Sequence, residues 1–213
     1  MSESERHYIL MSDIINSSSK ESGLLMKVFK KVVTDTNQKF SAQILSPLTI
    51  TLGDEFQGVV KSLKAAIAII FYFDEQLLSY SPAFSVRHVL NYGAIGTPIN
   101  SKQAHGMLGE GLSKARELLG EIKETHFEIS IAGLNSELVN QLKLAFELYR
   151  SIYNSWSEED KKVAFLFLKY KDYRLVAKEY QRDPSTMWRR EKSLKIREFN
   201  AAKELIQLLT ANG

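Results

Sequence analysis

Two aspartates stand at places in this sequence where strands are expected to end. Asp13 closes the apolar run 7–13, and Asp54 follows Gly53 at the tip of a hairpin expected between residues 40–52 and 55–60. In an antiparallel sheet, a hairpin beside the first strand brings its tip next to the end of that strand. The two carboxylates would then converge, although 41 residues separate them in the chain.

Converging carboxylates repel each other unless a cation lies between them or one of them takes up a proton. Mg²⁺ suits such a pair, because it prefers a few hard oxygen ligands, keeps several waters and bridges to phosphates. A plainer interpretation also fits both residues, since Asp after Gly is common in hairpin turns and Asp often ends a strand. The spacing alone leaves both interpretations open.

The first part of the chain, up to residue 133, alternates between strands and helices. Strands are expected over 7–13, 40–52, 55–60, 84–94 and 126–131, and helices over 20–39, 63–80 and 112–121. The order strand, helix, hairpin, helix, strand, helix, strand predicts an α+β fold. We expect a mostly antiparallel sheet with the helices on one face.

From residue 134 onward the sequence predicts only helices. A helix over 134–156 has an apolar face, so it either packs on the first part or pairs with a second copy of the chain. We therefore expect three parts: a domain over 1–133, a connecting helix over 134–156 and a helix-turn-helix domain over 157–213. The residues of the apolar face are Leu138, Leu142, Phe146, Tyr149 and Tyr153.

Two helix starts are well marked in the last part. Ser157 and Asp160 have the spacing of a capping box, and Asp183 followed by Pro184 is typical of an N-cap and a first helical position. A short helix, a tight turn and a basic helix follow the pattern of a helix-turn-helix motif. The stretch 176–190 resembles the version of this motif found in sigma factors.

This interpretation places the outward residues of the helix that starts at 184 in or beside the DNA major groove. Arg189 would contact a base edge, and the other basic residues would contact phosphates. Gln181, where glycine is common, and Arg182, where an apolar residue is common, depart from the motif. The predicted DNA-binding residues are Ser185, Thr186, Trp188, Arg189, Arg190, Lys192 and Lys195.

The charge distribution is compatible with DNA binding but does not require it. The segment from Glu158 to the end holds 13 Lys or Arg against 9 Asp or Glu, although the whole chain has a net charge of only +3. A solvated helix face would explain this excess as well as a DNA-binding surface would. Trp188 keeps a second interpretation open, a helical cap or dimerisation element that never touches DNA.

The composition excludes several classes of protein. With 44% apolar and 25% charged residues, the chain lies in the globular range. The absence of cysteine excludes disulfides and thiolate metal sites and fits a reducing cytoplasm. No secretory signal pattern is visible, and the longest apolar stretch, 65–73, is about half of the ~20 residues that span a bilayer. We therefore expect a cytoplasmic protein that has no membrane partner.

The segments YILMSDIINS (8–17) and ITLGDEFQGVV (50–60) resemble the two metal-aspartate motifs of class III nucleotidyl cyclases, and residues 53–56 match four letters of the GGDEF signature of diguanylate cyclases. Both resemblances imply a palm-type, ferredoxin-like fold in which two aspartates hold Mg²⁺. The chain also resembles the SatD family over nearly its whole length, through residues 50–58, 84–97, 109–119 and the C-terminal motif. That resemblance implies an architecture and not an activity.

The cyclase resemblance implies roles for individual residues. Asp13 and Asp54 would be the metal ligands and the candidates for a catalytic role, with the carbonyl of Ile14 as a third ligand. Ser113 and Arg116, where a glycine-containing loop leads into a helix, would bind the nucleotide.

This chain departs from the cyclase pattern at several positions. Ile50 stands where adenylyl cyclases of this class tend to have an adenine-reading Lys, and Ser113 stands where the family has Asn. Arg116 is about one position out of register with the family's transition-state Arg. For Arg87, inside a strand, we expect a structural ion pair. The comparison therefore favours binding of metal and triphosphate over catalysis.

Three functions follow as hypotheses. The leading one is a homodimeric, DNA-binding transcriptional regulator whose cyclase-like domain binds a nucleotide with Mg²⁺, with the helix 134–156 carrying the signal. The alternative is an active nucleotidyl cyclase or nucleotidyltransferase with regulatory C-terminal helices. A third is an adaptor in which both surfaces meet proteins.

Overall fold

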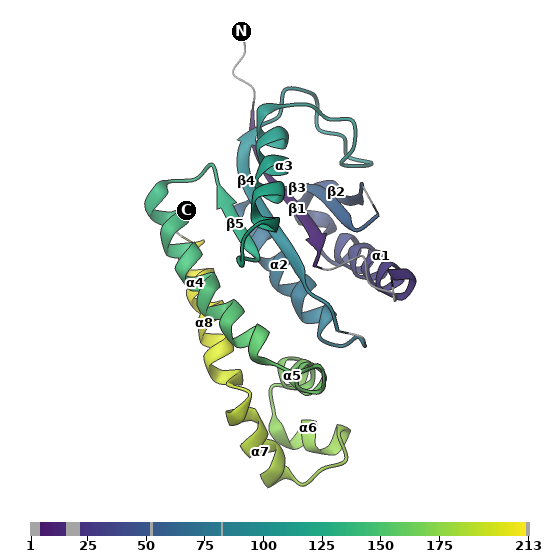
Figure 1. Ribbon diagram of the computed structural model, residues 1–213, viewed down its shortest axis with the longest axis vertical. Helices are drawn as coiled ribbons and strands as arrows, with labels where there is room; N and C mark the ends of the chain where they lie inside the picture. The colour runs from purple at the N-terminus through teal and green to yellow at the C-terminus, as the bar shows by residue number, and fades with distance from the viewer. Residues whose placement is uncertain (1–4, 16–21, 52, 82, 212–213) are drawn as a thin grey trace.

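The computed structural model describes residues 5–15, 22–51, 53–81 and 83–211 and has the α+β fold that the element order predicts (Figure 1). A five-stranded sheet has the strand order β2-β3-β1-β4-β5. Neighbouring strands are antiparallel except for β4 and β5, which are parallel. The strands are β1 Arg6–Ile14, β2 Ile44–Ile50, β3 Glu55–Val60, β4 Val86–Ala94 and β5 Ile129–Ala132.

Strand β1 lies in the middle of the sheet and is apolar on both sides. Because successive side chains of a strand point to opposite faces, Ile9 and Met11 pack in one hydrophobic cluster and Leu10 and Ile14 in another. Helices therefore cover both faces of the sheet and not one face, so the prediction of a single covered face is wrong. A strand that is apolar on both sides needs other elements to cover both faces of its sheet.

Helices α1 (Ser22–Lys39) and α2 (Leu63–Leu77) cover the face to which Leu10 points, and α3 (Glu110–Lys123) covers the other face. Helix α2 begins after Ser62, whose side chain accepts a hydrogen bond from the N–H of Ala65. It ends at Leu77, three residues before its predicted end. The predicted start of the first helix at residue 20 lies outside the described residues.

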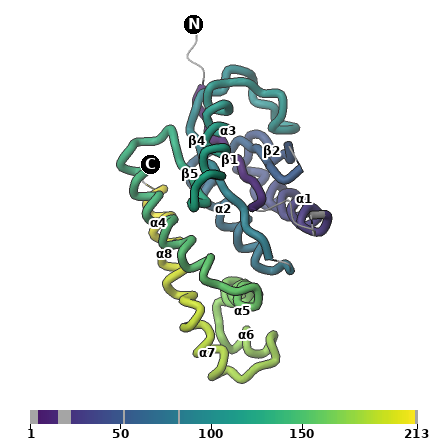
Figure 2. Tube along the Cα trace, in the orientation of Figure 1, coloured from purple at the N-terminus to yellow at the C-terminus, as the bar shows by residue number. Residues whose placement is uncertain are grey.

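After β5 the described chain consists of helices joined by short connections, as predicted. Figures 1 and 2 show α8 running back along α4, with α6 and α7 farthest from the sheet. Within the described ranges, no helix combines the length and the apolar character needed to cross a membrane. The helices are α4 Ser136–Ser155, α5 Glu158–Tyr170, α6 Tyr173–Glu179, α7 Pro184–Ser193 and α8 Ile196–Leu209.

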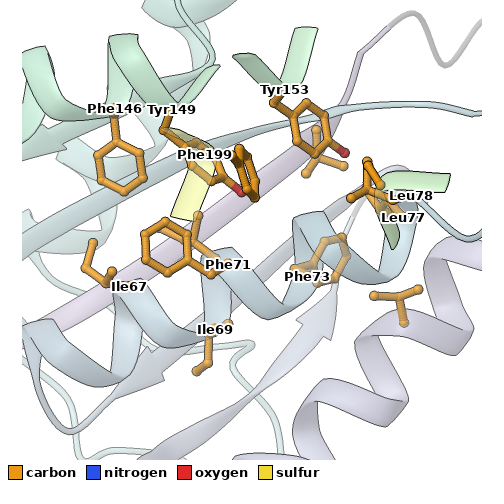
Figure 3. Close-up of a cluster of buried hydrophobic side chains, with 14 of the residues drawn as sticks. Ile67, Ile69, Phe71, Phe73, Leu77, Leu78, Phe146, Tyr149, Tyr153 and Phe199 are labelled. Carbon is orange, nitrogen blue, oxygen red and sulfur yellow. The ribbon is translucent and has the colours of Figure 1, made fainter. Parts of the chain in front are cut away.

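Aromatic side chains join the C-terminal helices to α2 (Figure 3). The ring of Tyr149 in α4 lies 5.2 Å from Phe71 in α2 and 4.8 Å from Phe199 in α8. Burying one such ring stabilises the fold by about 1.5–3 kcal/mol. These residues belong to one cluster that extends from Leu10 in β1 to Ile206 in α8. In the described part of the chain, a separate all-helical domain is therefore not evident.

The two helix starts that the sequence marks with capping residues are confirmed. Ser157 and Asp160 form a capping box at α5, and the side chain of Asp183 accepts a hydrogen bond from the N–H of Ser185 at the start of α7. Gln181, between α6 and α7, has φ 52°, a left-handed conformation that costs a residue with a side chain roughly 1–2 kcal/mol. The turn is tight even though it contains no glycine.

Candidate functional site

Asp13 and Asp54 lie at the same end of the sheet, as the hairpin pattern predicts. Asp13 is the second-to-last residue of β1, and Asp54 directly precedes β3. The N–H of Ile14 donates to the carbonyl of Asp54 at 3.0 Å, which ties the β2–β3 turn to the end of β1. Gly53 has φ 81°, a conformation that glycine adopts without steric cost. This turn therefore keeps the two aspartates together.

Glu55 and Arg87 flank Asp13 on the neighbouring strands. In the antiparallel register, Asp13 lies opposite Glu55 of β3 and opposite Arg87 of β4. The three side chains therefore share one face of the sheet, the face that α3 covers. Nη1 of Arg87 lies 3.6 Å from Oδ2 of Asp13, which is the ion pair expected for this arginine.

Helix α3 places two more cations over the carboxylates. Nη1 of Arg116 lies 3.0 Å from Oε1 of Glu55, and Nζ of Lys123 lies 3.3 Å from Oδ2 of Asp13 and 3.6 Å from Oε2 of Glu55. The side chains of Asp13 and Glu55 are 5% and 9% exposed, whereas those of Arg116 and Lys123 are 45% and 38% exposed. The carboxylates are thus buried beneath cations that reach solvent.

Two glycines allow α3 to pack closely on β4. A Cβ on Gly111 would lie 2.6 Å from the carbonyl carbon of Gly93, which is closer than real Cβ atoms come to other atoms. The side-chain amide of Asn91 in β4 donates to the carbonyl of Gly111 at 2.8 Å. This close approach holds Arg116 and Lys123 over the end of the sheet.

Burial raises the pKa of Asp13. Lys123 lowers this pKa, but the charges of Asp54 and Glu55 raise it again, and the balance is a pKa above the ordinary value. Ionised Asp13 therefore costs folding free energy that the neighbouring cations offset only in part. Groups with shifted pKa values cluster at functional sites, although structural ion-pair networks shift pKa values too.

The donor set of this cluster fits Mg²⁺. Asp13, Asp54 and Glu55 offer carboxylate oxygens, and proteins often hold Mg²⁺ by one or two carboxylates together with water and phosphates. No group of three or more His, Asp or Glu forms a ready-made metal site among the described residues. Lys123 lies against Asp13 and Glu55, so a metal ion would compete with it.

Ser113 and Ile14 are less closely tied to this cluster. Ser113 is exposed one turn before Arg116, and its N–H donates to the carbonyl of Gly109. The side chain of Ile14 is buried in the core. Their assignments to nucleotide and metal stay predictions.

The sequence patterns did not predict that Lys123 and Glu55 belong to this site. Lys123 lies beyond the predicted end of its helix at 121. Residues seven apart in a helix share a face, so a helix extended to 123 would have put Lys123 beside Arg116. Glu55 lies opposite Asp13 in the pairing of β1 with β3, which the position of the hairpin could have indicated.

The predicted DNA-binding residues lie at the end of the molecule farthest from the sheet (Figure 1). Arg190 forms an ion pair with Asp160, and Nζ of Lys192 lies 3.6 Å from the centre of the Trp188 ring. Those that are exposed are Ser185, Thr186, Trp188, Arg189, Lys192 and Lys195.

Two cavities lie away from the carboxylates, between β5 and α4. Their volumes are about 190 Å³ and 320 Å³, and both are lined by Phe127, Ile129 and Lys143. Neither is lined by Asp13, Asp54 or Glu55. The carboxylates, which lie beneath Arg116 and Lys123, are therefore not part of either cavity.

Two solved structures overlap with parts of this chain. One is a bacterial light-regulated adenylyl cyclase, with a TM-score of 0.44 and 17% identity over 59% of this chain and 42% of that chain. The other is the guanylyl cyclase Cya2, with a TM-score of 0.34 and 13% identity over 55% of this chain and 72% of that chain. The chain spans less than half the length of the first protein. Overlaps this weak say nothing about the activity of this chain.

No curated protein matches the chain. The model of the SatD family matches residues 8–206, a range that takes in the sheet, the carboxylate cluster and most of the C-terminal helices. The chain therefore belongs to the SatD family.

Proposed function

We propose that this protein binds a nucleoside triphosphate together with Mg²⁺ at Asp13 and Asp54 and acts on it by nucleotidyl transfer, as a cyclase or a nucleotidyltransferase does. The observation that carries the proposal is the position of the two aspartates, held together by the hydrogen bond from the N–H of Ile14 to the carbonyl of Asp54. The raised pKa of Asp13 supports it, because a costly buried carboxylate needs a reason to be retained.

The charges around the pair suit a triphosphate. Mg²⁺, when bound, would neutralise phosphate charge and orient the phosphates. Arg87, Arg116 and Lys123 surround the carboxylates, and a guanidinium can bind two phosphate oxygens at once. Arg116 and Lys123 now contact Glu55 and would exchange this carboxylate for phosphate oxygens. Both are more than a third exposed, so they can turn toward a ligand at little cost.

The same residues leave the choice of base open. Ile50, at the end of β2, offers no charged or hydrogen-bonding side chain at the position where an adenine-reading Lys would stand. We therefore name nucleoside triphosphates as the substrate class and no single base.

Incubation of the full chain with each nucleoside triphosphate and Mg²⁺ or Mn²⁺, followed by mass spectrometry of the products, tests the proposal. We expect turnover of at least one triphosphate and its loss in Asp13→Asn and Asp54→Asn, which keep the shape of each side chain and remove its charge. Glu117→Gln is a matched control, because Glu117 is an exposed acid on α3 that pairs with Lys114. Equal turnover in all variants, or no turnover of any triphosphate by the wild type, would contradict the proposal.

DNA binding through α7 stays a prediction, as does the homodimer. The comparisons give DNA binding no support. Arg190 forms an ion pair with Asp160, and Lys192 lies over the ring of Trp188. Binding to DNA that weakens steeply as salt is added would establish it.

A further inference from the structure

A buried chain of polar side chains lies behind the carboxylate cluster, on the opposite face of the sheet. Ser12 of β1 pairs with His88 of β4, directly beside the pair formed by Asp13 and Arg87. Oγ of Ser12 lies 2.6 Å from Nδ1 of His88, and Nε2 of His88 lies 3.1 Å from Oδ1 of Asp74 in α2. The exposed fraction of each of these three residues, Ser12, His88 and Asp74, is 0%.

Hydrogen bonds link Ser12, His88 and Asp74 in the order found in the catalytic triad of hydrolases, but the burial of Ser12 excludes this role. A nucleophilic serine must reach a substrate, and Ser12 lies in the middle of the sheet beneath α2. The three side chains therefore connect parts of the protein to each other.

Helix α4 holds Asp74, the last of these three side chains. The hydroxyl of Tyr149 donates to Oδ2 of Asp74 at 3.2 Å, and Nη2 of Arg150 lies 2.9 Å from the same oxygen. The hydroxyl of Tyr153 donates to the backbone carbonyl of Asp74 at 3.2 Å. Because α4 leads directly into α5–α8, Asp74 links the C-terminal helices to the sheet.

The hydrogen bonds that join Ser12, His88 and Asp74 have a defined direction. Burial lowers the pKa of His88, so its ring is neutral and carries one N–H. Burial alone would raise the pKa of Asp74, but Arg150 and His88 lower it, and the carboxylate is ionised. The N–H on Nε2 then donates to Asp74, and Nδ1 accepts a hydrogen bond from the hydroxyl of Ser12. Moving any member would leave a buried polar group without its partner, which is costly.

We propose that Ser12, His88 and Asp74 are positioning residues that couple α4 to the strand ends carrying Asp13 and Arg87, so that a shift of the C-terminal helices changes how the carboxylate cluster holds its ligand. The consequence for ligand binding rests on the proposed function. The coupling itself does not, because it can be measured in the protein without any ligand.

Hydrogen exchange of the Ile14 amide measures this coupling, since that amide closes the β2–β3 turn onto β1 through the carbonyl of Asp54. Ser12→Ala removes the hydrogen bond between β1 and His88. Arg150→Lys disturbs the contact between α4 and Asp74 while keeping the positive charge. Ser46→Ala is the matched control, because Ser46 is also fully buried and donates to the carbonyl of Asn100.

We expect Ser12→Ala and Arg150→Lys each to speed exchange at Ile14 by at least roughly fivefold, the effect of losing one buried hydrogen bond, relative to a core amide such as that of Ile70. The double variant should exchange no faster than Ser12→Ala alone, because the disturbance at α4 no longer reaches β1. Ser46→Ala should leave this ratio unchanged. If Arg150→Lys fails to fold, Tyr149→Phe removes a smaller contact from Asp74 and takes its place.

Two outcomes would overturn the coupling: exchange at Ile14 in Ser12→Ala equal to that in Ser46→Ala, or effects of the two changes that simply multiply in the double variant. Titration of the same proteins with Mn²⁺ and ATP or GTP separates this inference from the proposed function. Failure of the wild type to bind either mixture would remove the proposed function, while the exchange data would still decide the coupling.

Discussion

Replacing Arg150 with Met would leave the carboxylate of Asp74 buried without the guanidinium that neutralises it. The exposed fraction of Asp74 is 0%, and Nη2 of Arg150 lies 2.9 Å from its Oδ2. The remaining side-chain partners, His88 and Tyr149, are neutral. Removing one partner of a buried ion pair costs about 3–5 kcal/mol. In a chain of this size 1 kcal/mol shifts Tm by about 2–4 °C, so we expect Tm to fall by roughly 6–20 °C.

The cost of Arg150→Met should shrink as the pH falls. In the wild type the pKa of Asp74 is lowered, because Arg150 and His88 outweigh the effect of burial. Its contribution to stability is therefore present above the ordinary Asp pKa of about 4 and is lost only as the pH falls through the lowered value. In the variant, burial acts without Arg150 and raises this pKa, so Asp74 takes up a proton earlier and the buried charge disappears. The gap in unfolding free energy between the two proteins should narrow from neutral pH toward about pH 4.

Urea unfolding, followed by tryptophan fluorescence, measures this gap. Trp156 is buried, and its Nε1–H donates to the carbonyl of Leu194 at 2.9 Å, so its emission reports on the packing of the C-terminal helices. Lys143→Met removes an exposed cation from the same helix and should cost less than about 1 kcal/mol. Adding Asp74→Asn to Arg150→Met should recover most of the loss. A cost below about 1 kcal/mol at neutral pH, or one that is the same at every pH, would refute the reasoning.

Three further changes test the site. Asp13→Asn should raise Tm at neutral pH, because burial raises the pKa of Asp13 and the wild type loses stability as the pH rises through that value. If the Tm values of the variant and the wild type still differ below about pH 4, this cause is wrong. Gly111→Ala should cost about 1–3 kcal/mol in urea unfolding, because its Cβ would meet the backbone of Gly93, whereas Gly120→Ala, which meets nothing within 4 Å, should stabilise by up to about 1 kcal/mol. Lys123→Gln should tighten binding of Mn²⁺ alone, measured by calorimetry, because Lys123 lies where a cation would compete for Asp13; unchanged affinity would show that it does not compete.

Local patterns were enough to predict the order of the elements and the convergence of the aspartates. The tip of the β2–β3 hairpin is marked by Gly53, and the start of α7 is marked by Asp183 and Pro184, because each needs a particular backbone conformation or cap. These features depend on neighbours in the sequence, and therefore the sequence reveals them.

Contacts between distant elements could not be predicted in this way. The second covered face of the sheet depends on α3, whose approach rests on two glycines 18 residues apart, Gly93 and Gly111. The pairing of Asp74 with Arg150 joins α2 to α4 across 76 residues. One signal was present: Asp74 is a charged residue in a helix too apolar to be exposed, and a buried charge requires a partner.

Binding of Mn²⁺ in the presence of a nucleoside triphosphate, followed by electron paramagnetic resonance, tests most directly whether Asp13 and Asp54 together hold a divalent cation. We predict that the wild type takes up Mn²⁺ with the triphosphate, and that Asp13→Asn and Asp54→Asn each weaken this uptake by about tenfold or more, equivalent to about 1.4 kcal/mol. Uptake by both variants at the affinity of the wild type would contradict the account.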